Sequence, residues 1–214
     1  MKSISLQVSS ILAITFGFAV FLSVSIDLHA DSYNATLKIG DEAPAWKDLP
    51  GVDDKTHSLD DFNSHEILVV IYTCNSCPVA TDYEDRLCTF AEKYADNDSK
   101  VGVVAINVNK IKEDQLPAMK KRAASKRFPF PYLYDESQKI AKDFGAVFTP
   151  EVYVLNRERK VIYMGAIDDH SDPTLAKRHY LVEAVEAGLS GKRLVDQEIV
   201  PIGCRIRYAR ERRK

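Results

Sequence analysis

The fold of this chain is decided by the stretch ILVVIYTCNSCP, residues 67–78. Ile67–Thr73 is a continuous apolar run of strand length, typical of a strand that is covered on both faces. Over Pro78–Ala95, apolar residues recur at helical spacing. Cys74 and Cys77 therefore lie at the turn between a buried strand and the helix that follows it.

Strands and helices continue to alternate beyond this turn. The other expected elements are a strand at Val101–Val108, a helix at Leu116–Lys126, an extended segment at Phe128–Tyr134, a helix at 136–144, a hairpin of Glu151–Asn156 with Val161–Met164, and a helix at Pro173–Leu189. This pattern predicts an α/β fold with helices on both faces of a central sheet.

Composition and charge limit the class of protein. The chain has 214 residues, of which 45% are hydrophobic and 28% charged, the balance of a folded domain. Its net charge is −2, so no overall positive field indicates nucleic acid as a partner. We expect one domain at residues 39–200, after a linker at 31–38. Residues 205–214 are strongly basic, and we assign 201–214 to a basic C-terminal tail.

The first thirty residues have the composition of an export signal. Lys2 precedes an uncharged run at Ser3–Ile26, and the small residue Ala30 marks the expected cleavage position. An uncleaved anchor is the alternative, because about 20 apolar residues span a bilayer. Either interpretation predicts an exported protein, periplasmic or otherwise outside the cytoplasm, which contacts a membrane only if this segment stays attached. Such a compartment permits disulfide bonds.

Two cysteines three positions apart at a helix N-terminus are typical of redox chemistry. The free N–H groups and the dipole of the first turn stabilise a thiolate, and Pro78 fits there because that turn does not use its missing N–H. A thiolate attacks a disulfide, and a second thiol resolves the mixed disulfide. We expect Cys74 to be the more exposed cysteine and to attack, with Cys77 as its partner. No cofactor is expected, because electrons come from and return to other thiols.

Other interpretations of the four cysteines stay open. Cys-x-x-Cys is half of a zinc site, but Cys88 and Cys204 do not form a second pair and the histidines are scattered, so we assign no metal. A purely structural disulfide within the pair would close a short loop, which gains little from chain entropy. We expect Cys88 to pack in the core. Cys204 either returns to the site as a resolving thiol or packs elsewhere.

Several ordered motifs resemble those of a known superfamily. The cysteine pair between strand and helix, followed by Thr149-Pro150 before a further strand, resembles the thioredoxin fold. The stretch Ile39-Gly-Asp-Glu-Ala-Pro44 resembles the start of redoxin domains of the alkyl hydroperoxide reductase/thiol-specific antioxidant (AhpC/TSA) type. The chain is similar to a peroxiredoxin-like branch through CNSCP at 74–78, YEDRL at 83–87, VAIN at 104–107, FPFPYL at 128–133, TPE at 149–151, GAIDD at 165–169 and IGC at 202–204.

This resemblance implies a fold, a binding site and a class of partner. The fold is thioredoxin-like, with a mixed central sheet. The Thr149–Pro150 bond is expected to be cis, and the backbone beside Thr149 and Pro150 to bind the substrate. The expected partners are protein or small-molecule thiols and disulfides, or hydroperoxides.

One departure from typical peroxiredoxins concerns the peroxide. Their Pro-x-x-x-Thr-x-x-Cys signature supplies a threonine that orients the peroxide, but Cys74 stands at the threonine position before Cys77 and Val70 at the proline position. The sequence therefore favours an exported thiol–disulfide oxidoreductase. It leaves open a peroxidase that uses Cys77 with Cys74 as resolving thiol. A non-enzymatic copper- or partner-binding module, similar to Sco-type proteins, is a second alternative, although a proline motif replaces their metal-binding histidine.

Overall fold

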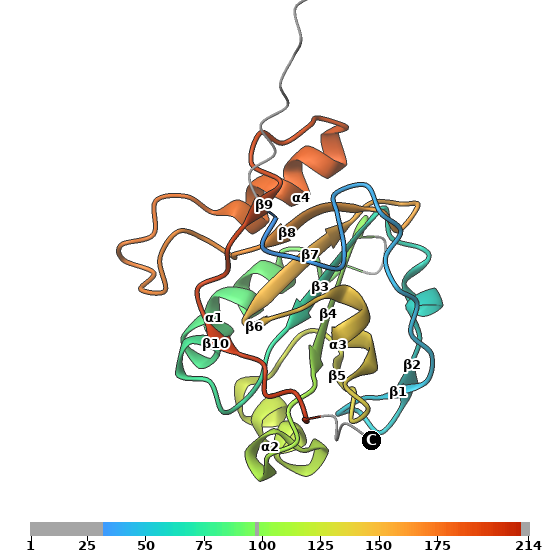
Figure 1. Ribbon diagram of the computed structural model, residues 1–214, viewed down its shortest axis with the longest axis vertical. Coiled ribbons are helices and arrows are strands. Elements are labelled where there is room, and N and C mark those ends of the chain that lie inside the picture. Colours follow the sequence, from blue (N-terminus) through green and yellow to red (C-terminus); the bar gives the residue numbers. More distant parts are fainter. Residues whose placement is uncertain (1–31, 97–98, 211–214) are drawn as a thin grey trace, which may run out of the picture. The chain divides into compact units, whose positions relative to one another are not determined.

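The computed structural model describes residues 32–96 and 99–210, so the expected signal at residues 1–30 lies outside the described part (Figure 1). The main sheet has six strands in the order β5-β4-β3-β7-β8-β9. Their bounds are β3 Ile67–Tyr72, β4 Val101–Asn107, β5 Tyr132–Tyr134, β7 Glu151–Leu155, β8 Val161–Gly165 and β9 Glu198–Ile199. Strand β7 runs antiparallel to β3 and β8, and the other neighbours are parallel. The sheet is therefore mixed, as expected.

Helices cover both faces of this sheet. The α-helices are α1 Pro78–Glu92, α2 Leu116–Lys126, α3 Lys139–Phe144 and α4 Tyr180–Ser190, and the 3-10 helices are η1 Leu59–Phe62 and η2 Lys112–Asp114. Val69 and Ile71 of β3 pack in a core cluster with α1, α2 and α4, whereas Val70 and Tyr72 pack on the other face with α3 and η1. Because neighbouring strand residues face opposite sides, burial on both faces explains the continuous apolar run. The predicted α/β fold is confirmed.

The last helix is shorter than predicted. We expected it at Pro173–Leu189, but it begins at Tyr180. In the preceding loop, Oδ1 of Asp172 accepts the N–H of Thr174 at 2.8 Å. Such local side-chain bonds compete with helical backbone bonds. Leu175 is 55% exposed, so burial of this apolar side chain does not stabilise a helix there.

Two short strand pairs lie outside the main sheet. Strand β1 (Leu49–Pro50) pairs with β2 (Thr56–His57), and β6 (Phe148–Thr149) pairs antiparallel with β10 (Cys204–Arg205). The second pair lies beside the N-terminal end of α1 (Figure 1). Residues 201–208, which we assigned to the tail, thus contribute a strand and place Ile206 in the core. None of the described helices is long and apolar enough to cross a membrane.

Candidate active site

Cys77 caps the N-terminus of α1. Its Sγ accepts the N–H of Ala80 at 3.4 Å, and Pro78 stands in the first turn as expected. The N–H groups of a first turn have no partner within the helix, and the helix dipole is positive at this end. This position therefore stabilises a thiolate whenever Cys77 is reduced.

Cys77 is joined to Cys204 by a disulfide bond. The two residues are 127 positions apart in the sequence, and their Cα atoms are 6.0 Å apart. The sequence left open whether Cys204 returns to the site or packs elsewhere, and the structure places it in the site. Its role as a resolving thiol stays a prediction, as does a disulfide between Cys74 and Cys77.

Cys74 is a free thiol in the same cluster. It packs with Cys77, Ala80 and Cys204, and its Sγ lies 3.3 Å from Oγ1 of Thr149. Only 3% of Cys74 is exposed, compared with 2% of Cys77. Cys74 is thus only marginally more exposed than Cys77, because Thr149 lies against both sulfur atoms and the turn is buried, so exposure does not distinguish the two thiols.

The Thr149–Pro150 peptide bond is cis, as the resemblance implied. The Thr149 hydroxyl contacts Cys74, and its carbonyl oxygen lies 3.2 Å from Sγ of Cys77. The backbone that we expect to bind substrate is therefore next to both sulfur atoms. In this structure it is paired with β10 of the same chain.

Glu151 fixes the backbone that leads into β6. Its Oε2 accepts the N–H groups of Val147 and Phe148, both at 2.8 Å, and its Oε1 accepts the hydroxyls of Tyr153 at 2.6 Å and Tyr33 at 3.1 Å. Burial raises the pKa of this carboxyl above its usual value, while the hydrogen bonds act in the opposite direction. The edge that β6 presents is thus held by a buried, fully bonded side chain.

Asp114 organises the cysteine turn, and our sequence analysis did not single it out. Its Oδ1 accepts the N–H groups of Asn75 and Ser76 at 2.7 and 3.0 Å, and its Oδ2 accepts the Ser76 hydroxyl. The amides of Asn107 and Asn109 donate to the same carboxylate. The sequence signal was a cluster of polar residues directly after an apolar strand, at the end of the sheet where parallel strands finish.

Replacing Asp114 by alanine removes the acceptor for the N–H groups of Asn75 and Ser76 in a buried site. We expect the free energy of unfolding to fall by about 3–5 kcal/mol, because each buried donor left without a partner costs about 1–3 kcal/mol. Urea unfolding of Asp114→Ala measures the change. The matched control is Glu113→Gln, since that neighbouring side chain is exposed. A loss below about 1 kcal/mol for Asp114→Ala, no larger than one ordinary hydrogen bond, would show that the carboxylate is not an organising group.

Cys88 lies outside this cluster. It is a residue of α1 and packs in the core, which confirms the prediction that Cys88 is a core residue. Burial, together with the nearby carboxylates of Asp85 and Glu92, raises the pKa of its thiol to about 11. Cys88 is therefore a neutral, unreactive thiol near pH 7. Within residues 32–96 and 99–210, no group of three or more His, Cys, Asp or Glu side chains is arranged to hold a metal ion.

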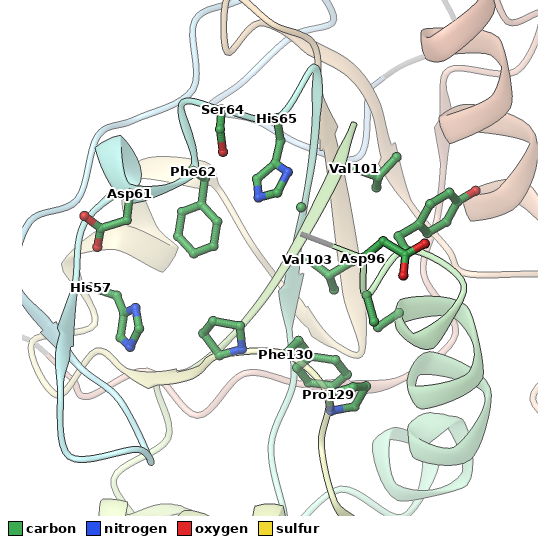
Figure 2. Close-up of a pocket in the computed structure, with 15 residues that line it drawn as sticks. His57, Asp61, Phe62, Ser64, His65, Asp96, Val101, Val103, Pro129 and Phe130 are labelled. Carbon is green, nitrogen blue, oxygen red and sulfur yellow. The ribbon is translucent and has the colours of Figure 1, made fainter. Parts of the chain in front are cut away.

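A separate pocket carries two histidines and no cysteine (Figure 2). Nε2 of His57 lies 3.1 Å from the carboxylate of Asp53, and Nδ1 of His65 lies 2.9 Å from the carbonyl oxygen of Ser99. Each ring already has a partner of its own, and the two rings do not contact each other (Figure 2). This pocket therefore adds no group to the chemistry of the cysteine site.

The mixed sheet, the cysteine turn at a helix N-terminus and the cis proline beside it define a thioredoxin-like thiol oxidoreductase. A family model described as Redoxin matches residues 38–178, and the chain belongs to this family. The matched range includes Cys74, Cys77, Thr149 and Pro150, whereas Cys204 lies beyond it.

Individual proteins are similar over most of the chain. Chloroplastic peroxiredoxin Q from Suaeda salsa is 28% identical over 168 residues, which cover 72% of this chain and 75% of that protein. A solved structure of a hypothetical protein from Sinorhizobium meliloti is 31% identical, with a TM-score of 0.74, over 81% of this chain and 96% of that one. An uncharacterized conserved protein from Geobacillus kaustophilus is 32% identical, with a TM-score of 0.75, over 81% and 94%.

Proposed function

We propose that this chain is a thiol–disulfide oxidoreductase whose exchanging sulfur is Sγ of Cys77. The observation that carries the proposal is the position of Cys77, which caps α1, contacts the Thr149 carbonyl and is bonded to a second cysteine of the chain. The missing threonine and proline of the peroxiredoxin signature, replaced by Cys74 and Val70, support exchange rather than peroxide reduction.

The reaction balances with thiols alone. The Cys77 thiolate attacks one sulfur of a client disulfide, which forms a mixed disulfide and releases the other client sulfur as a thiolate. The Cys204 thiolate then attacks Sγ of Cys77, which forms the Cys77–Cys204 bond and releases the second client thiol. The client gains two electrons, and the protein loses them. Run in reverse, the same steps oxidise a client dithiol.

The geometry supports an attacking role for Cys77 rather than for Cys74. A helix N-terminus stabilises the Cys77 thiolate, whereas Cys74 precedes the helix and is equally buried. Cys74 is the second thiol in contact with the pair, placed to attack Cys77 and release Cys204. Cys77 and Cys204 are thus the proposed exchanging pair, with Cys74 beside them and with Thr149 and Pro150 binding the client backbone.

Exchange with glutathione disulfide tests this assignment. The reduced full-length chain is mixed with glutathione disulfide, thiol loss is followed over time, and the bonds formed are mapped by peptide analysis. We expect a Cys77–Cys204 bond as the product. Cys74→Ser should keep the initial rate within about 3-fold, because the nucleophile and its activating helix remain. Loss of exchange in Cys74→Ser would return the attacking role to Cys74.

A peroxidase is the second candidate, and one observation favours it. Cys77 occupies the position of the reactive cysteine in peroxiredoxins and is bonded to Cys204, as a resolving thiol would be. In that reaction the Cys77 thiolate takes an oxygen from the hydroperoxide, which leaves as water or an alcohol, and Cys204 then condenses with the sulfenic acid and releases water. Reaction with hydrogen peroxide at about 10⁴ M⁻¹s⁻¹ or faster would establish it. Slow peroxide reaction with rapid disulfide exchange would leave the first candidate.

We also propose that the chain is exported. Support comes from Lys2 and the uncharged run Ser3–Ile26, which have the pattern of a signal or an anchor. N-terminal sequencing of the protein recovered from the producing cell tests this: a new terminus near residue 31 indicates a cleaved signal. An intact Met1 in the membrane fraction indicates an anchor, and an intact Met1 in the cytosol overturns the proposal.

A further inference from the structure

Residues 203–209, which include β10 at Cys204–Arg205, are bound to the rest of the chain along their length. Their side chains alternate in burial: Ile206 is buried and Tyr208 half-buried, whereas Arg205, Arg207 and Ala209 are exposed. A period of two is the pattern of a strand with one face on a surface. The segment thus lies across the domain in the way that an added peptide strand does.

The first part of the segment pairs with the backbone of β6. Cys204 is opposite Thr149, and Arg205 is opposite Phe148. The N–H of Ile206 then donates to the Val147 carbonyl at 2.8 Å. This pairing uses the strand edge that carries the cis proline.

Two buried side-chain amides hold the second part. Oδ1 of Asn109 accepts the N–H of Arg207 at 2.9 Å. Gln138 bridges two peptide groups, since its Nε2 donates to the Arg207 carbonyl at 3.0 Å and its Oε1 accepts the N–H of Ala209 at 2.8 Å. Asn109 and Gln138 are 2% and 1% exposed. Because both amides bind backbone groups, they recognise any extended chain in this register.

The side chains that face inward set a sequence preference. A Cβ at Gly203 would lie 2.3 Å from the carbonyl oxygen of Thr149, a backbone atom, so the position before the cysteine requires glycine. Ile206 is buried in the core cluster that α3 lines, and the Tyr208 hydroxyl donates to the Ala146 carbonyl at 2.7 Å. These contacts favour a segment with glycine and cysteine at its first two positions, which correspond to residues 203 and 204. They also favour an apolar residue at the fourth position and an aromatic residue at the sixth, whereas the third and fifth positions accept any residue.

We propose that β6, Asn109 and Gln138 form a binding groove for an extended segment of a client protein that carries a Gly–Cys pair, and that residues 203–209 occupy this groove as an internal substitute. The inference rests on the proposed function, because the client cysteine takes the place of Cys204 opposite Cys77. In the exchange, the Cys77 thiolate bonds to that cysteine and the client's other cysteine leaves as a thiolate. While Cys77 and Cys204 are bonded, the tethered segment excludes the client through its high effective concentration.

Peptide binding to full-length variants tests the groove without any redox step. The probe is a fluorescent peptide of residues 200–210, with serine in place of its cysteine, followed by anisotropy. The variant Gly203→Ala with Cys204→Ser removes the tether and displaces the resident segment through the clash with Thr149. The dissociation constant of the probe should be at least about 10-fold lower for this variant than for the oxidised wild-type chain. The reason is that the resident segment no longer competes with the probe for the same contacts. The variant Ile206→Asp with Cys204→Ser provides a second way to displace the segment.

Two control peptides make the result specific. A peptide with alanine in place of its glycine should bind at least about 10-fold more weakly, because its Cβ meets a rigid backbone atom. A scrambled peptide of equal charge should not bind, which excludes attraction of arginines to the acidic remainder of the chain. The proposal is overturned if neither variant binds the probe, or if the alanine or scrambled peptide binds equally well.

The failure of this inference can be told apart from failure of the proposed function. If the wild-type chain exchanges with glutathione disulfide but neither variant binds the probe, the protein is an oxidoreductase without this groove. Variants that bind the probe while the wild-type chain exchanges no disulfide leave a peptide-binding groove without the chemistry. A concentration-dependent dimer of the reduced wild-type chain would show that a second copy, rather than a client, fills the groove, and would overturn the assignment of the occupant.

Discussion

Cys77→Ser is expected to abolish disulfide exchange. The remaining thiols are poor substitutes: Cys74 precedes α1, Cys204 lies in β10, and Cys88 has a pKa of about 11. Because the substitution removes the attacking sulfur itself, we expect the rate of exchange with glutathione disulfide to fall by about 10³-fold or more. The measurement is the initial rate of mixed-disulfide formation by the reduced full-length chain.

The matched control is Cys88→Ser, which makes the same substitution at a thiol outside the cluster. It should keep the wild-type rate of exchange. If Cys77→Ser retained more than about a tenth of that rate, Cys77 would not be the nucleophile, because removing an attacking atom costs far more than tenfold. A simultaneous loss in Cys74→Ser would then identify Cys74 as the attacking cysteine.

Removing the Cys77–Cys204 bond should lower the stability of the fold strongly. A disulfide restricts the unfolded chain, and the effect grows with the length of the closed loop. For a sequence separation of 127 residues, the chain-entropy relation gives about 5 kcal/mol. We therefore expect Cys204→Ser to lower the free energy of unfolding, measured with guanidinium under oxidising conditions, by about 3–5 kcal/mol.

Comparison under reducing conditions separates the bond from the side chain. In the presence of dithiothreitol, the wild-type chain and Cys204→Ser should differ by less than about 1 kcal/mol, because neither contains the cross-link. Cys74→Ser serves as the control that keeps the bond and should retain its stabilisation. Equal stabilities of oxidised wild type and Cys204→Ser would show that the bond does not restrain the unfolded chain.

Two features of the structure depend on contacts that the sequence pattern does not contain. Burial of Cys74 depends on Thr149, which the fold brings to the cysteine turn from 75 positions away. The start of α4 at Tyr180 depends on whether the preceding residues find a core, and the exposed Leu175 shows that they do not. The spacing of apolar residues indicates which residues are able to form an amphipathic helix. Whether they form it depends on whether the apolar side chains are buried.

The C-terminal segment shows how a local signal was misread. Cys204, Ile206 and Tyr208 alternate with arginines, which is the period-two pattern of a strand. Because residues 205–214 are also strongly basic, we expected a tail. In the described part of this segment, Arg205 and Arg207 are exposed and alternate with the inward-facing Ile206 and Tyr208.

By itself, the sequence determined the succession of strands and helices from β3 to β8, the turn that carries Cys74 and Cys77, and the helix that begins at Pro78. These features follow from the spacing of apolar residues and from turn chemistry within a few positions along the chain. Only the tertiary structure decided that Cys77 pairs with Cys204, that Asp114 holds the turn, and that residues 203–209 cover the edge of β6. Those contacts join residues 38 to 127 positions apart. Their distances are fixed by how the strands pair and the helices pack, which no local pattern encodes.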